Sequence, residues 1–137
     1  MSNESLSEKV SVNINSSTLS SIDLLVDNGY YSNRSDFINQ ALRSALQQQQ
    51  STLDRIISQN TDAAEESNPW FIGVYGLSKQ DIMRLFDAGK HIRIRGYGVL
   101  VIDKDCPEEK VFAVVDSIRV KGKILCASSV RQHYGIK

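Results

Sequence analysis

The sequence predicts an α+β protein in two parts, and three patterns along the chain predict it. Residues 9–15 alternate strictly between polar and apolar side chains, as a half-buried strand does. Two helical patterns follow at once, separated by the Gly-Tyr-Tyr turn of residues 29–31. The motif Ile-x-Val/Ile-x-Gly then occurs at residues 72–76, 92–96 and 118–122, with one amphipathic helix pattern between the first two. The second part is therefore expected to be a small β-rich domain carrying one helix.

The alternating segment at residues 9–15 gives its two faces different chemistry, because a strand sends successive side chains to opposite faces. The apolar set is Val10, Val12 and Ile14, and the polar set is Lys9, Ser11 and Asn13. A lone strand is not stable, and about 40 residues bury too little apolar area to fold alone. We therefore expect a second copy to pair its strand antiparallel with this one and to interlock its helices, giving an intertwined homodimer.

Cap and turn residues limit the two helices. The first should begin after Asn15 or Ser16, either of which can cap it, and end at Gly29, where glycine can take a positive φ. Ser35 is predicted to be the N-cap of the second helix. The apolar stripe of that helix is broad enough for a dimer core and consists of Ile38, Ala41, Leu42, Ala45 and Leu46.

The second helix is expected to continue to about Gln59. The glutamines at 47–50 favour helix, and the apolar spacing resumes at Leu53, Ile56 and Ile57, as in a coiled-coil seam. The competing interpretation of the glutamines is a low-complexity linker.

Composition divides the chain. Residues 60–68 carry no apolar anchor and end at Pro69, so they are predicted to link two domains. The predicted parts are a flexible arm at 1–8, a strand-helix-helix dimerisation domain at 9–59, the linker at 60–68, and an α+β oligomerisation or sensing domain at 69–137.

The first third of the chain resembles a known family. The strand VSVNI, the turn DNGYYSNRSDFI and the following QALRSAL are similar to ribbon-helix-helix DNA-binding proteins of the MetJ/Arc/CopG type. Residues Tyr31, Asn33, Arg34, Ser35 and Asp36 resemble the opening of the second helix in nickel-responsive repressors of that family. The resemblance implies an intertwined dimer whose two-stranded ribbon enters the major groove of double-stranded DNA.

The polar side chains of the predicted ribbon suit base edges. Asn13 can pair bidentately with adenine, Lys9 can reach guanine or a phosphate, and Ser11 is permissive. The start of the second helix offers free backbone amides to a DNA phosphate. The predicted contacts there are Asn33, Arg34 and Ser35. The structural alternatives are a merely solvated strand face and a serine that only caps its helix.

Charge is unevenly distributed along a chain whose net charge is zero. Residues 1–50 hold three basic and five acidic groups, against twelve basic and seven acidic groups in residues 69–137. A DNA-binding half that is acidic overall must rely on locally placed groups. In the second domain a basic stripe is predicted on one face of the sheet. It could contact the DNA backbone, an acidic partner or an anionic effector, or it could simply be solvated. Its residues are Arg93, Arg95, Arg119 and Lys121.

The second domain contains an internal repeat. Its segments IRIRGYGVL and IRVKGKIL align on Gly96 and Gly122, and each has a neighbouring apolar strand pattern, VLVID and VFAVVD. One helix is expected from Ser78, its N-cap, to Gly89. The segment VFAVVDSIRVKGKILCASSV distantly resembles the stacked β-turn layers of bactofilins and of the C-terminal domain of the cell-division inhibitor MinC, which implies self-association. An ordinary small sheet packed by one helix fits the same residues.

Other chemistry has no pattern to support it. His91 and His133 form no His-x-His pair, and Cys106 and Cys126 are not at ligand spacing from them, so no metal or cofactor is expected. The sequence has no phosphate-binding glycine loop and no nucleophile elbow, so no enzyme is expected. It also shows no membrane span and no signal peptide, which predicts a cytoplasmic location.

These patterns predict a site-specific DNA-binding transcriptional regulator, which is expected to repress and not to activate transcription. The second domain should join dimers into a tetramer or receive a signal. One alternative is the antitoxin of a toxin–antitoxin pair, whose toxin-binding tail would be disordered alone. The other is an assembly protein that polymerises through β-layers.

Overall fold

The computed structural model describes residues 7–136, which divide into two compact units. One unit is Glu8–Ile56, and the other begins at Ile57. Residues 1–6 of the predicted flexible arm lie outside the described residues.

The first unit contains the two predicted helices and the turn between them. Helix α1 spans Ser16–Asp27, and the side chain of Asn15 caps it by accepting a hydrogen bond from the backbone N–H of Ser17. Gly29 follows with a φ of 80°, as the turn requires. Helix α2 spans Arg34–Gln48 and packs against α1. The cap and end predicted for the first helix are confirmed.

The N-cap of α2 is Asn33 and not Ser35, so this prediction is wrong. Asn33 has an extended backbone, with φ at −166°, and its Oδ1 accepts a 2.8 Å hydrogen bond from the backbone N–H of Asp36. Ser35 lies within the first turn. Both residue types cap helices well, but the backbone leaves the extended conformation only after residue 33.

The second helix does not continue unbroken to Gln59. It ends at Gln48 and is capped by Gln49, and a separate helix, α3, spans Gln50–Ala63. The start of the predicted linker at 60–68 is therefore helical. Residues 60–63 contain neither glycine nor proline, so nothing in them stops a helix.

The strand predicted for residues 9–15 requires a second copy, and within the single chain these residues form no strand. Val10 and Val12 are 77% and 73% exposed. A strand is held by hydrogen bonds to a neighbouring strand, and the neighbour expected here belongs to a second copy. The apolar side of the predicted ribbon therefore faces solvent in one chain.

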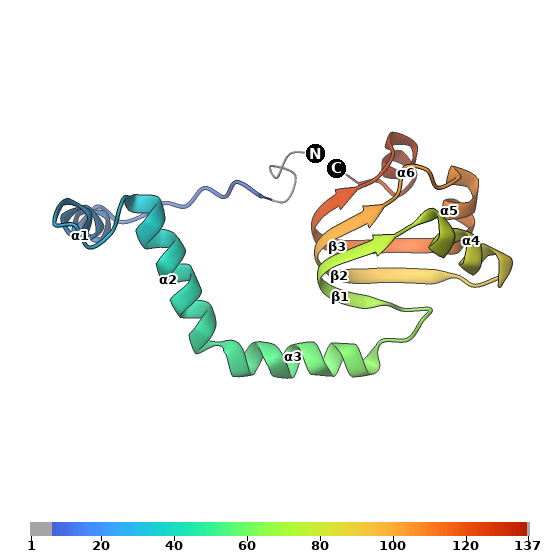
Figure 1. Ribbon diagram of the computed structural model, residues 1–137, viewed down its shortest axis with the longest axis horizontal. Coiled ribbons are helices and arrows are strands. Elements are labelled where there is room, and N and C mark those ends of the chain that lie inside the picture. The colour runs from blue at the N-terminus through green and yellow to red at the C-terminus, as the bar shows by residue number, and fades with distance from the viewer. Residues whose placement is uncertain (1–6, 137) are drawn as a thin grey trace. The chain divides into compact units, whose positions relative to one another are not determined.

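The second unit is a parallel three-stranded sheet in the order β1-β2-β3, covered on its inner side by helices (Figure 1). Helix α4 joins β1 to β2, α5 joins β2 to β3, and α6 follows β3. The bounds are β1 Trp70–Leu77, α4 Lys79–Asp87, β2 Ile92–Ile102, α5 Glu108–Val114, β3 Val115–Leu125 and α6 Ser128–His133. The expected single helix is thus one of three in residues 70–136, and the unit also contains the end of α3, residues 57–63.

Helix α4 forms as predicted. Ser78 and Asp81 make a reciprocal capping box, and Gly89 follows the helix with a φ of 64°. Helix α5, by contrast, occupies most of the segment that was predicted to be the apolar strand VFAVVD. Two acidic residues in its first turn, Glu108 and Glu109, favour a helix start there, so the strand begins only at Val115.

Each strand curves back on itself near its middle, and its two halves enclose the core together with the helices (Figure 1). Gly73, Gly98 and Gly122 are register neighbours with φ values of 106°, 127° and 139°. A Cβ on Gly98 would lie 2.0 Å from the carbonyl oxygen of Gly73, and one on Gly122 would lie 1.9 Å from that of Gly98. At this corner only glycine fits at positions 98 and 122.

The glycine ladder corrects the predicted repeat alignment. Gly122 is paired with Gly98, whereas Gly96 is paired with Val120, so the alignment on Gly96 is two residues out of register. The layers stack as a repeat architecture does, but a helix and not a β-turn connects each layer to the next. In this respect the likeness to bactofilins and MinC is wrong.

The core of this unit is apolar. Among the described residues no polar or charged side chain is fully buried, and the two free cysteines, Cys106 and Cys126, are buried thiols. Its most deeply buried side chains are Ile82, Ile92, Ile94, Leu100, Ile102, Val111, Val114 and Val115.

Candidate nucleic-acid interface

The six predicted DNA-contacting residues lie in two groups on the first unit. Three belong to the segment that precedes α1, and three lie at the N-terminus of α2. All six are exposed: Lys9, Ser11, Asn13, Asn33, Arg34 and Ser35. Within the described chain no hydrogen bond or ion pair joins one group to the other, so the single chain does not bring the two groups together.

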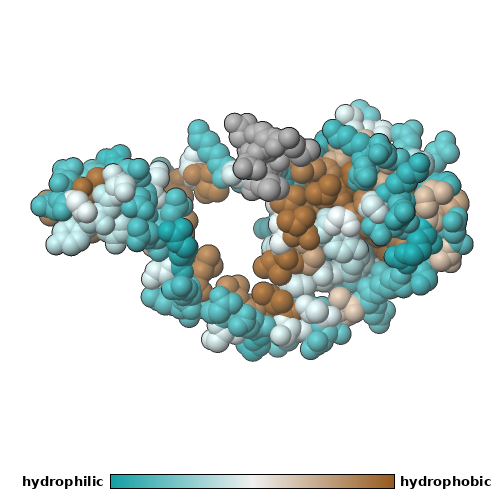
Figure 2. Space-filling model, in the orientation of Figure 1, coloured by the Kyte–Doolittle hydropathy of each residue, from teal (hydrophilic) through white to brown (hydrophobic). Residues whose placement is uncertain are grey.

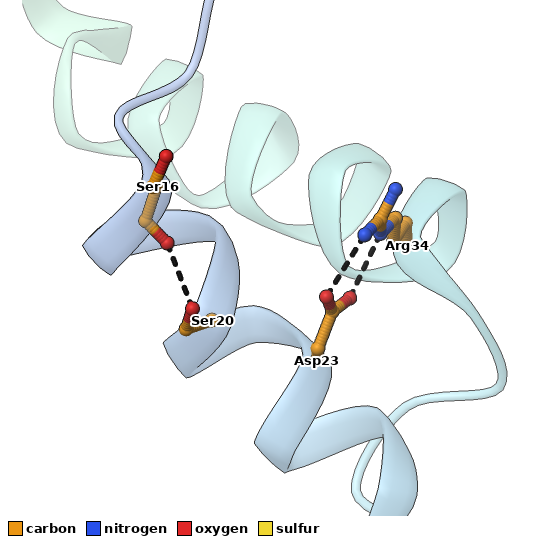
Figure 3. Close-up of polar contacts among 4 residues, drawn as sticks. All are labelled: Ser16, Ser20, Asp23 and Arg34. Atoms are coloured by element: carbon orange, nitrogen blue, oxygen red, sulfur yellow. Dashed lines mark hydrogen bonds and ion pairs between the residues drawn. The ribbon is translucent and has the colours of Figure 1, made fainter.

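Arg34 is held by a carboxylate that no pattern in the sequence singles out. Its Nε and Nη2 donate to the two oxygens of Asp23 on α1, each at 2.8 Å (Figure 3). This hydrogen-bonded pair lowers the pKa of Asp23 and raises that of Arg34. Both side chains remain accessible, at 57% and 41% exposure. The pair fixes the guanidinium at the junction of α1 and α2.

The first turn of α2 has a reciprocal cap. Besides the bond from Asp36 to Asn33, the carboxylate of Asp36 accepts a 2.9 Å hydrogen bond from the backbone N–H of Ser32. That bond, followed by one from the side chain of Gln40, lowers the pKa of Asp36. The backbone N–H groups of Arg34 and Ser35 have no acceptor among the described residues. They are the amides left for an external anion.

Sequence reasoning missed Asp23 and the capping role of Asp36. Asp36 follows Asn33 by three residues, the spacing of a capping box, and that signal could have found it. The spacing of Asp23 and Arg34, eleven residues apart in the sequence, is not a helical one, so their pairing depends on how α1 packs on α2.

The first unit leaves most of its large apolar side chains in solvent. Ile22 is its one fully buried apolar residue within the described chain. The exposed ones are Val10, Val12, Ile14, Leu24, Tyr30, Ile38, Leu42, Leu46 and Ile56. A surface of this kind marks an interface, and it includes both the predicted ribbon and the predicted helix stripe.

The described residues contain neither a membrane-spanning helix nor a cluster of metal ligands. Over residues 7–136, no helix has the length and apolar character needed to cross a bilayer. In the same residues, no three His, Cys, Asp or Glu side chains gather as ligands of a metal ion would.

A capped helix pair with an exposed apolar stripe follows a segment with strand alternation, which is the order of elements in a ribbon-helix-helix protein. The model of the Ribbon-Helix-Helix transcriptional regulator family matches residues 5–131, so the chain belongs to this family. It is a DNA-binding transcriptional regulator, and members of the family are generally not enzymes. No curated protein and no solved structure is detectably similar to the chain.

Proposed function

We propose that the protein is a homodimeric, site-specific repressor that reads DNA through an intermolecular β-ribbon. Residues 9–15 of two copies pair antiparallel, and their apolar side chains close over the exposed stripe of α2. The exposed apolar surface of the first unit is the observation that carries this proposal. One buried apolar side chain cannot offset the entropy of ordering some fifty residues, so the unit needs a second copy.

Pairing two such segments would point Lys9, Ser11 and Asn13 of both copies away from the helices. A two-stranded ribbon fits the major groove, where an asparagine can pair with adenine. Arg34, already oriented by Asp23, would reach a phosphate with the donors that Asp23 leaves unused, beside the free amides of Arg34 and Ser35. Asn33 shapes this site as the helix cap.

The repressor is favoured over an antitoxin because of the second unit. A toxin-binding tail is expected to be disordered alone, whereas residues 70–134 form three strands, three helices and a buried apolar core. Repression is part of the same proposal. A cytoplasmic location follows from it, because a repressor acts where its DNA lies.

The proposal is tested by separating base contacts from phosphate contacts. Asn13→Ala should remove a base-edge pairing worth about 1–3 kcal/mol at one symmetric position in each half-site, with the fold unchanged. Arg34→Ala should weaken binding to specific and random duplexes alike and flatten the salt dependence. Both are measured by titration of matched, point-mutated and random duplexes at two salt concentrations. Equal weakening of all duplexes by Asn13→Ala would show that the ribbon does not read the sequence.

A further inference from the structure

Four cations of the second unit have no carboxylate partner among residues 7–136. They lie on the outer side of the sheet, ahead of the glycine corner, and all are exposed: Arg93 and Arg95 on β2, Arg119 and Lys121 on β3. The ion pairs that the described part of this unit contains are made by other cations, which are Arg84 and Lys90 with Glu66, and His91 with Asp116. The four therefore leave a local excess of positive charge.

Their register makes this charge unfavourable for folding. Arg95 is the direct cross-strand neighbour of Arg119, and like charges placed opposite each other destabilise a sheet. Charges on an edge strand can be explained as protection against unwanted pairing. That explanation does not apply to Arg93 and Arg95, because β2 is the central strand. An arrangement that costs stability points to an anionic ligand.

The cations line two open hollows that share Arg95 and Arg119. One, of about 460 Å³, is also lined by Trp70, Tyr97 and Lys121. The other, of about 470 Å³, is lined by Arg93 and has the carboxylate of Glu65 among its lining residues. The rings of Trp70 and Tyr97 meet edge to face at a centroid distance of 6.5 Å. Together the hollows form a shallow basic groove with an aromatic wall.

We propose that this basic groove binds the phosphate backbone of duplex DNA. Alternate residues of a strand are about 6.8 Å apart and neighbouring strands about 4.8 Å apart, so the four cations cover an extended surface and not one point. A polyanion neutralises such a surface, whereas one small phosphate would meet two of the four at most.

The inference rests on the proposed function, which supplies the DNA. Residues 1–50 are acidic overall, and Arg34 is already paired with Asp23. Affinity that is independent of base sequence must then come largely from elsewhere in the chain. The basic groove supplies it, and the first unit selects the sequence.

The test uses the full chain and its single tryptophan, Trp70, as a reporter within the groove. Random duplex should change the emission of Trp70. In the double variant Arg95→Gln with Arg119→Gln, that change should be lost. The slope of log affinity against log salt should become shallower by about 1.8 per protomer, or about 3.6 for a homodimer with both grooves on DNA. The preferred base sequence should stay the same.

The matched control is Arg84→Gln with Lys90→Gln, which removes the same charge from cations that Glu66 already pairs. It should keep the Trp70 response and nearly the full salt slope. If both double variants lost the same amount of salt slope, the change would be explained by net charge alone, and the inference would be wrong. Thermal unfolding should find the Arg95/Arg119 variant no less stable than the parent, because it relieves a cross-strand repulsion.

Other outcomes separate this inference from the proposed function. If the parent selects its operator while Trp70 emission and the variant's salt slope stay unchanged, the groove does not bind DNA and the ribbon proposal stands. If Trp70 responds to inorganic phosphate or a free mononucleotide but not to duplex, the groove is a small-anion site and the inference is wrong. If the parent shows no sequence preference but Trp70 responds to random duplex, the groove is supported and the ribbon proposal fails.

Discussion

At the scale of single residues, the conformation of the backbone decides which of two neighbouring side chains caps α2. Asn33 and Ser35 are both good N-caps, and residue type alone cannot choose between them. The choice is made by the backbone, which is extended at Asn33, and by the hydrogen bond that the backbone N–H of Ser32 donates to the carboxylate of Asp36. The Asp23–Arg34 pair could not be predicted, since it depends on the packing of α1 against α2.

Asn33→Ala should destabilise the first unit, and Ser35→Ala should not. The first change removes the acceptor for the backbone N–H of Asp36 and should cost about 1 kcal/mol of unfolding free energy. The second removes a hydroxyl that makes no capping bond. Thermal unfolding followed by circular dichroism measures both, and a larger loss for Ser35→Ala would contradict the observed cap.

At the scale of elements, long periodic patterns were predictable and short or register-dependent ones were not. Helix α4 was recognisable from its capping residue and its final glycine. Helices α5 and α6, with seven and six residues, are too short for a helical period to show. The glycine repeat can be recognised in the sequence, but residue type alone does not show whether Gly96 or Gly98 is the neighbour of Gly122. Both lack room for a Cβ, and only the pairing of Gly98 with Gly122 and its positive φ distinguish Gly98 from Gly96.

The glycine corner predicts a graded series of substitutions. Gly98→Ala combines a φ of 127° with a Cβ 2.0 Å from a carbonyl oxygen, so it should cost more than the roughly 1–3 kcal/mol of a strained backbone alone. Gly73→Ala has the strain but no neighbour within 4 Å and should cost less.

Gly76→Ala is the control for this series. It lies on the same strand as Gly73, has no positive φ and would meet nothing within 4 Å. Denaturant unfolding should rank the stabilities as Gly76→Ala, then Gly73→Ala, then Gly98→Ala. Equal costs at Gly73 and Gly98 would mean that close backbone approach contributes nothing.

At the scale of the whole molecule, the two units differ in how far one chain completes them. The second unit buries a continuous apolar core, whereas the first buries one apolar side chain fully and exposes nine large ones within the described residues. Figure 2 shows apolar residues as separate patches on a visible surface that is mostly hydrophilic. The sequence predicted this difference for the first unit, because a strand pattern of seven residues without a partner strand implies a second chain.

Leu42→Asp should abolish the dimer while leaving the second unit folded. Leu42 is 56% exposed in the single chain and is proposed to be buried by the partner. An unpaired carboxylate there would cost several kcal/mol, a large part of the roughly 5–15 kcal/mol that holds a domain together. Light scattering should show loss of the dimer, and circular dichroism should retain strand signal. Asn39→Asp, with the same added charge at an exposed polar position of α2, should remain dimeric.

A tetramer would need a second contact, and the free edge of β1 is the best candidate for it. Strand β1 contains no charged residue, and its Ile72 and Val74 are 51% and 69% exposed. An uncharged, apolar edge strand is a ready template for pairing. The opposite edge, β3, carries cations that would repel one another across a symmetric pairing.

Val74→Lys should therefore reduce a tetramer to a dimer, because two-fold pairing of β1 with β1 would bring the new charges together and desolvate them. Val74→Thr keeps the branched shape without the charge and should stay tetrameric. Light scattering over a range of concentrations measures both, with operator binding by the Val74→Lys dimer as the check on folding. A parent that is dimeric at all concentrations would exclude this contact, and an open polymer that survives Val74→Lys would place the assembly interface on another surface.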